Sequence, residues 1–157
     1  MKFKEGIELA VAVIVCELLG SIGAIFTMMS IWTWYALLRK PSFTPPDAVF
    51  APVWTLLFAL MGIAVFLVWQ RRKQIDVRWP LVAFGLQLCL NVAWSVVFFG
   101  MRNIAGGFVD IVALWCMILG TIIIFWRDSR PAAWLLMPYL AWVTFAMFLN
   151  YQLLVLN

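Results

Sequence analysis

The sequence predicts an all-α integral membrane protein, a bundle of five transmembrane helices. Of its 157 residues 66% are hydrophobic and only 11% are charged, whereas a soluble domain carries charge at about a quarter of its positions. The apolar residues gather in five blocks, each about as long as the 20 residues that a helix needs to cross a bilayer. Five crossings with short loops use the whole chain, so we expect residues 1–157 to form one domain without a soluble module.

The first two blocks run from about residue 7 to 31 and from 46 to 69. The first is longer than the apolar core of a signal peptide and carries Glu8 and Glu17, so we expect it to stay in the mature protein. The second follows a proline-rich loop, KPSFTPPDAVFAPVW. Its prolines fix the backbone angle φ and remove amide donors, so the loop is predicted to be a lid of defined shape. Pro46 is suited to the first position of the helix that follows.

The remaining blocks cover residues 79–100, 105–126 and 132–156. Helices are expected in all five because lipid offers no partner to an unpaired backbone N–H or C=O group, and the strict alternation of a β-barrel is missing.

Basic residues predict the orientation of the bundle. Three lie on the side of the proline loop: Arg39, Lys40 and Arg102. Eight lie on the side of the N-terminus: Lys2, Lys4, Arg71, Arg72, Lys73, Arg78, Arg127 and Arg130. The positive-inside rule then predicts a cytoplasmic N-terminus, in the cell membrane if the source is prokaryotic. Loops beside anionic lipid account for the net charge of +4, so no nucleic-acid partner is expected.

We expect neither a metal site nor a catalytic triad. The chain has no histidine, which excludes a His-ligated haem or zinc site and a His-containing triad. The three cysteines, Cys16, Cys89 and Cys116, fall inside predicted helices without the spacing of a disulfide framework or a metal site. We predict no metal and no obligatory cofactor.

The third block carries two stripes at helical spacing. Gln87, Asn91 and Ser95 form a polar stripe beside Trp94, which would be costly in lipid and is expected to face the bundle interior. Interhelical hydrogen bonding alone could also explain it. A second stripe of small residues, offset by two positions, would allow close helix approach and is predicted to form a dimer contact: Gly85, Cys89 and Ala93.

The second and fifth blocks add aromatic and small residues to the candidate site. Trp54 and Phe58 lie one turn apart near the proline loop. In the fifth block one face carries Trp142, Ala146, Leu149 and Asn150. Five other tryptophans sit where interfacial belts are expected: Trp32, Trp34, Trp69, Trp79 and Trp126.

Three segments, WYALLRKPSFTPPDAVFAPVWTLLFALMG, LNVAWSVVFFGMR and PYLAWVTFAMFLNY, resemble the tryptophan-rich sensory protein and translocator protein (TspO/MBR) family. The resemblance implies a five-helix bundle, usually dimeric, with a pocket under the first loop. It implies as ligands porphyrins and other tetrapyrroles, sterols, and benzodiazepine or isoquinoline carboxamide drugs. It places these residues in the pocket: Tyr35, Trp54, Asn91, Trp94, Ser95, Trp142 and Ala146, with Phe58, Phe98, Leu149 and Asn150 extending the wall.

Two features depart from the family pattern. The proposed sterol motif keeps Leu149 and Tyr151 but lacks its basic residue, so sterol transport is not supported. Glu17, near the middle of the first block, has no expected counterpart. It is either a functional carboxyl group or a protonated one that bonds to Gln87 or Asn91 at similar depth.

Three functions follow for testing. The first is a receptor or carrier that binds porphyrin as its ligand, in tetrapyrrole sensing, transport or stress response. The second is a light- and oxygen-dependent breakdown of porphyrin, with Trp54 and Trp142 as reactive side chains; no other catalytic residue is expected. The third is a structural or partner-binding protein without a small ligand.

Overall fold

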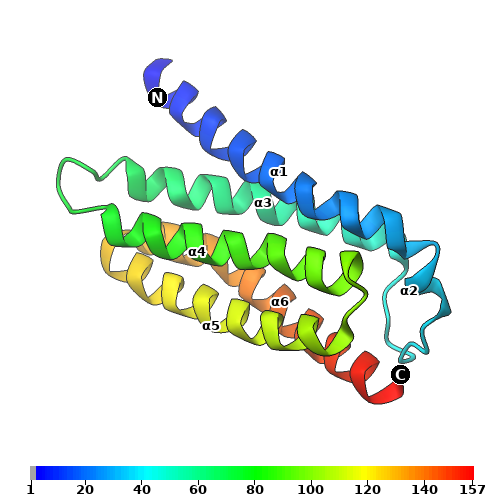
Figure 1. The fold of residues 1–157 in the computed structure, drawn as a ribbon. Coiled ribbons are helices and arrows are strands. Elements are labelled where there is room, and N and C mark those ends of the chain that lie inside the picture. Colours follow the sequence, from blue (N-terminus) through cyan, green and yellow to red (C-terminus); the bar gives the residue numbers. More distant parts are fainter. Residues whose placement is uncertain (1–2) are drawn as a thin grey trace.

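The computed structural model, which describes residues 3–157, confirms an all-α membrane fold (Figure 1). Five helices are long and apolar enough to cross a membrane. They are α1 (Phe3–Ile31), α3 (Asp47–Trp69), α4 (Arg78–Ser95) with its continuation η1 (Val96–Gly100), α5 (Ile104–Asp128) and α6 (Arg130–Leu156). Their ends lie within a few residues of the predicted blocks.

Two local features were not predicted. A short helix, α2 (Trp34–Leu37), precedes the proline loop, and the segment η1 at the end of α4 is a π-helical turn. Lys2, which entered the count of basic residues, lies outside the described part of the chain.

The five long helices form a closed ring. α1 packs against α3 and α4, α5 packs against α4 and α6, and α3 packs against α6. Figure 1 shows the start of α1 and the α3–α4 connection at one end of the bundle, and α2, the proline loop and the C-terminus at the other. The loops therefore divide between the two ends as the sequence predicted.

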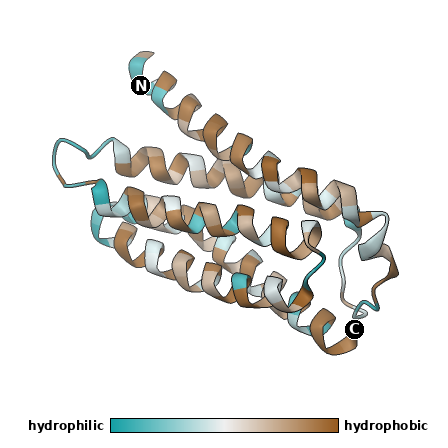
Figure 2. Ribbon diagram, viewed as in Figure 1, coloured by the Kyte–Doolittle hydropathy of each residue, from teal (hydrophilic) through white to brown (hydrophobic). Residues whose placement is uncertain are grey.

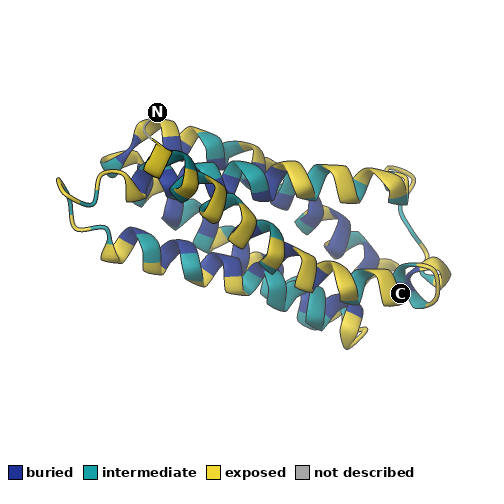
Figure 3. Ribbon diagram, turned by 90° about the horizontal axis from the view of Figure 1, so that it is seen from above, coloured by how far each residue is buried: buried dark blue, intermediate teal, exposed yellow. Residues whose placement is uncertain are grey.

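The outer surface of the bundle is suited to lipid. Apolar residues cover the length of the helices, and hydrophilic residues concentrate in the loops and near the helix ends (Figure 2). Exposed residues run along the outer sides of the helices (Figure 3). Many of them carry large apolar side chains, for example Val11, Leu18 and Ile25 on α1. A soluble protein would not expose so much apolar surface. The chain is an integral, multi-pass membrane protein.

Glycines permit close contact between α1 and α3. A Cβ atom at Gly62 would lie 2.5 Å from the Cα atom of Val13, and one at Gly20 would lie 2.3 Å from the ring of Phe58. Neither position could take a larger side chain without a shift of the neighbouring helix or ring. These glycines set the distance between the two helices that carry much of the candidate site.

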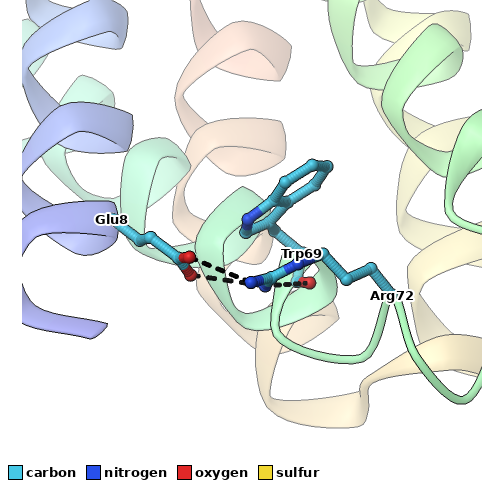
Figure 4. Close-up of polar contacts among 3 residues, drawn as sticks. All are labelled: Glu8, Trp69 and Arg72. Atoms are coloured by element: carbon cyan, nitrogen blue, oxygen red, sulfur yellow. Dashed lines mark hydrogen bonds and ion pairs between the residues drawn. The ribbon is translucent and has the colours of Figure 1, made fainter. Parts of the chain in front are cut away.

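A polar clasp joins α1 to the α3–α4 connection at the N-terminal end (Figure 4). The Arg72 guanidinium lies 2.9 Å from a Glu8 carboxylate oxygen, donates to the Trp69 carbonyl at 3.0 Å, and stacks 4.7 Å above the Trp69 ring. Because both charged side chains are partly exposed, the ion pair contributes at most about 1 kcal/mol. Its role is to fix the position of the connection beside α1.

Candidate functional site

A cavity of about 460 Å³ lies among α1, α3, α4–η1 and α6, next to α2 and the start of α3. Its volume falls in the range of small-molecule sites, roughly 300 to 1,000 Å³. The lining residues on α4 and η1 are Asn91, Trp94, Ser95, Phe98 and Phe99; those on α6 are Ala146, Leu149, Asn150 and Leu153.

The structure brings together in this wall all the predicted pocket residues except one: Tyr35, Trp54, Phe58, Asn91, Trp94, Ser95, Phe98, Ala146, Leu149 and Asn150. Trp142 does not line the cavity. Its ring packs edge-on against Phe50, with centroids 6.0 Å apart, and lies tilted against Phe145, with centroids 5.6 Å apart. Phe50 lines the cavity and Trp142 supports it. The Trp142 indole N–H is buried without a hydrogen-bond partner in the described chain.

Stacked aromatic pairs give the wall two flat surfaces. Trp54 stacks on Phe58 with centroids 5.7 Å apart, and Trp94 stacks on Phe98 at 5.2 Å. Each pair joins rings from successive turns of one helix, and ring pairs of this kind are worth about 0.5 to 1.5 kcal/mol beyond the burial of their area. The surfaces are suited to flat, apolar ligands.

The π-helical turn η1 explains why two consecutive phenylalanines both point inward. The Met101 N–H bonds to the Val96 carbonyl at 2.8 Å, five residues back, which adds a residue to the turn. Phe98 and Phe99 are both buried as a result. The Phe99 carbonyl accepts a 2.8 Å hydrogen bond from the buried Ser30 hydroxyl of α1, which holds the turn against that helix.

Buried amides fix the wall from behind. The Trp94 indole N–H donates to the Asn150 side-chain oxygen at 3.1 Å, and the Asn150 amide donates to the Ile104 carbonyl at 3.1 Å. The Asn91 amide donates to the Tyr139 hydroxyl at 2.9 Å. α4, α5 and α6 are thereby joined by hydrogen bonds at the level of the cavity.

Gln87, the first residue of the polar stripe, has a different place. It is 1% exposed and does not line the cavity, and neither its amide nitrogen nor its oxygen has a partner in the part of the chain that the structure describes. The stripe therefore faces the interior as predicted, but only Asn91 and Ser95 reach the cavity.

Contacts with α6 and the C-terminal residue hold the proline loop at its start and in its middle. The Arg39 N–H donates to the Asn157 side-chain oxygen at 2.9 Å, and the Asn157 amide donates back to the Arg39 carbonyl at 3.0 Å. Phe43 packs edge-on against Phe145 of α6, with centroids 6.3 Å apart. These contacts hold the loop over the end of α6.

Tyr35 of α2 forms part of the wall at this end. Burial, and secondly the nearby Asp47 carboxylate, raise the pKa of its phenol to about 12, so the hydroxyl is neutral at physiological pH. The Lys40 ammonium lies 4.6 Å above the Tyr35 ring. The loop end of the cavity therefore has a hydroxyl group in its wall and an ammonium group next to it.

The cavity is open between α1 and α3. Several lining residues on these helices are exposed, among them Ala24 on α1 and Ala51 and Thr55 on α3. Their side chains are small and leave space between the helices. These exposed residues open the cavity toward the outer surface of the bundle between α1 and α3.

Of the residues on α1 and α3 that line the cavity, the sequence placed only Trp54 and Phe58 in the predicted pocket. The missed α1 residues recur at helical spacing: Gly20, Ser21, Ala24, Thr27, Met28 and Ile31. The missed α3 residues do the same: Asp47, Ala48, Phe50, Ala51 and Thr55. Small and hydroxyl residues at this spacing on two apolar helices were a usable signal.

Glu17 also lines the cavity. The expected hydrogen bond to Gln87 or Asn91 is absent from the described residues: Gln87 has no partner and the Asn91 amide bonds to Tyr139. The structure thus gives no support to the structural role considered for this carboxyl group.

The predicted dimer stripe lies on the outside of α4. Gly85 and Ala93 are half-buried and Cys89 is exposed. A Cβ atom added at Gly85 would have no neighbour within 4 Å among the described residues. The stripe is therefore free of contacts that would prevent a second copy from approaching it.

Comparison with known proteins identifies the family. The model of the TspO/MBR family matches residues 12–156. The tryptophan-rich protein TspO of Chlorobaculum tepidum is 44% identical over 98% of both chains, and that of Archaeoglobus fulgidus is 40% identical over 96% of this chain and 97% of its own. The translocator protein of Bos taurus is 38% identical over 85% of this chain and 80% of its own. The chain belongs to the TspO/MBR family.

Proposed function

We propose that the protein binds porphyrins and related tetrapyrroles in the cavity, as a carrier or sensor in tetrapyrrole transport, sensing or stress response. The observation that carries the proposal is the aromatic cavity of about 460 Å³ beside the proline loop. Its stacked walls suit a flat ring, and a few polar groups are available to orient it. Benzodiazepine and isoquinoline carboxamide ligands share the flat, apolar character and would compete for the same space.

The relatives' names agree with a transport or sensing role in a membrane, since they include "Translocator protein" and "Tryptophan-rich sensory protein". The opening between α1 and α3 supports entry of an apolar ligand from lipid. The surplus of basic residues at the N-terminal end favours a cytoplasmic N-terminus, with the loop end of the cavity outward.

Porphyrin titration followed by tryptophan fluorescence tests the proposal. Saturable quenching is expected, with Trp54→Phe weakening the apparent affinity about threefold or more, because the smaller Phe ring offers less contact area to the ligand than the indole does. Trp69→Phe is the matched control, since Trp69 is 39% exposed and lies at the other end of α3. Equal losses of porphyrin affinity in the two variants would contradict the cavity as the binding site. Absence of any porphyrin binding would favour a structural or partner-binding role.

Light-dependent breakdown of bound porphyrin is the second candidate. Trp54 favours it because this oxidisable side chain lines the cavity, whereas Trp142 lies behind Phe50. Illumination of the porphyrin complex in air should then bleach the porphyrin bands in the wild type and more slowly in Trp54→Phe. Equal bleaching of free and bound porphyrin would exclude this activity.

We also propose that the protein is a homodimer that uses the Gly85, Cys89 and Ala93 stripe. Gly85→Leu is expected to shift cross-linked dimer toward monomer, because added bulk separates closely packed helices. The fold should survive, since the added side chain meets open space within its own chain. Gly120→Leu is the matched control because Gly120 on α5 also has nothing within 4 Å. An unchanged dimer in Gly85→Leu would assign the contact to another face.

A further inference from the structure

The cavity has an acidic group at the end farthest from the proline loop. Glu17 is the first residue of α1 to line the cavity, and it shares a face with Gly20, Ser21 and Ala24. At 1.5 Å per residue it lies about 21 Å along the axis from Ile31, where α1 ends. Its carboxyl group is therefore deep within the apolar span.

The Glu17 carboxyl group has no partner in residues 3–157. No hydrogen bond or ion pair of its side chain is present, whereas Glu8, nine residues earlier, is paired with Arg72. An ionisable side chain inside a transmembrane helix is costly to insert and is almost always paired or turned toward the bundle interior or a cavity. Nothing within the described protein offsets that cost, and the half-buried position on the cavity wall leaves the carboxyl oxygens open to a bound molecule.

The charges around the cavity are unevenly distributed. The acidic residues of its wall are Glu17 at the deep end and Asp47 at the loop end, and no lysine or arginine is among the lining residues. The nearest described ammonium group at the loop end is that of Lys40, which lies over Tyr35 outside the wall. A positive group on a ligand therefore finds an acidic partner at either end of the wall, and deep in the cavity that partner is Glu17.

We propose that Glu17 is a ligand-recognition residue and that the cavity selects flat amphipathic ligands with a protonated nitrogen, held against the Glu17 carboxylate. This inference rests on the proposed function of the cavity as a ligand site and adds a ligand class to it. An N⁺–H···O⁻ bond is roughly twice as strong as a neutral hydrogen bond, and a low-dielectric surrounding strengthens it further. The bond gives the half-buried carboxylate the partner that residues 3–157 do not provide.

Two isoquinoline carboxamide probes of equal size test the inference, one ending in a dimethylamino group that is protonated at neutral pH and one ending in an isopropyl group. Affinities are measured by tryptophan fluorescence for the full chain in lipid nanodiscs. The wild type should prefer the amine by about tenfold or more. Glu17→Gln keeps the size of the side chain and should abolish the preference, while the affinity for the isopropyl probe stays within about twofold.

Glu8→Gln is the matched control and should retain the amine preference, because Glu8 lies on the same helix as Glu17 but does not line the cavity. A wild type without the preference, or a preference that survives in Glu17→Gln, would overturn the inference. If porphyrin and the isopropyl probe bind normally in that case, the proposed function stands and the role of Glu17 alone fails. If the wild type binds neither porphyrin nor the isopropyl probe, both fail.

Discussion

Ala146→Phe is expected to lower the affinity for porphyrin and for isoquinoline carboxamides by at least about tenfold, or roughly 1.4 kcal/mol. Ala146 is 9% exposed and lines the cavity on α6, so the added ring would occupy space that a ligand needs. The change introduces neither a charge nor an unpaired polar group, and the protein should remain helical. Ligand titration and thermal melting on one preparation measure both effects.

Ala141→Phe is the control for this substitution, because Ala141 is exposed on α6 and does not line the cavity. It should leave the affinity unchanged. If Ala146 serves only packing, Ala146→Phe would overpack the bundle at a cost of about 1 to 3 kcal/mol. A lower melting temperature with unchanged affinity of the folded fraction would then contradict the cavity as the binding site.

Asn150→Leu is expected to destabilise the protein by about 2 kcal/mol, because it removes two hydrogen bonds made by a buried side chain and leaves the Trp94 indole N–H without its partner. The Trp94 indole N–H and the Ile104 carbonyl both bond to the Asn150 side chain, which is 1% exposed. Trp94 would also lose the contact that fixes its ring in the cavity wall. Denaturant unfolding in detergent gives the loss of stability, and porphyrin titration gives the effect on the wall.

Tyr151→Phe is the matched control, since Tyr151 is exposed beside Asn150 and its hydroxyl makes no hydrogen bond to the described residues. It should be close to neutral. A loss in Asn150→Leu of only about 0.6 kcal/mol, the average for a hydrogen bond between membrane helices, would show that Trp94 and Ile104 find other partners. The amide would then not be the element that holds this wall.

The sequence was sufficient for the fold because the bilayer imposes its own length on each helix. Blocks of apolar residues predicted five spans, and the structure has five helices of that kind. Their packing order around the ring was not predictable from hydropathy. The short helix α2 and the turn η1 were also missed, since they depend on tertiary contacts such as the Ser30 hydroxyl bond to the Phe99 carbonyl.

The cavity wall was predictable where helical spacing combined with polar or small residues, as for Asn91, Trp94 and Ala146. Trp142 shows the limit of that approach. Helical spacing placed Trp142 on one face with Ala146, but it does not specify which side chain lies nearest the cavity. Phe50 from α3 lines the cavity, and Trp142 lies behind it. Glu17 was recognisable as unusual, yet its lack of a partner could be found only in three dimensions.

The measurement that tests the central claim most directly is an experimental structure of the porphyrin-saturated protein in lipid. Our account predicts the porphyrin ring in the cavity, in contact with Trp54 and Trp94 and bounded by Ala146. A porphyrin held on the outer surface of the bundle, with the cavity free of it, would contradict the account.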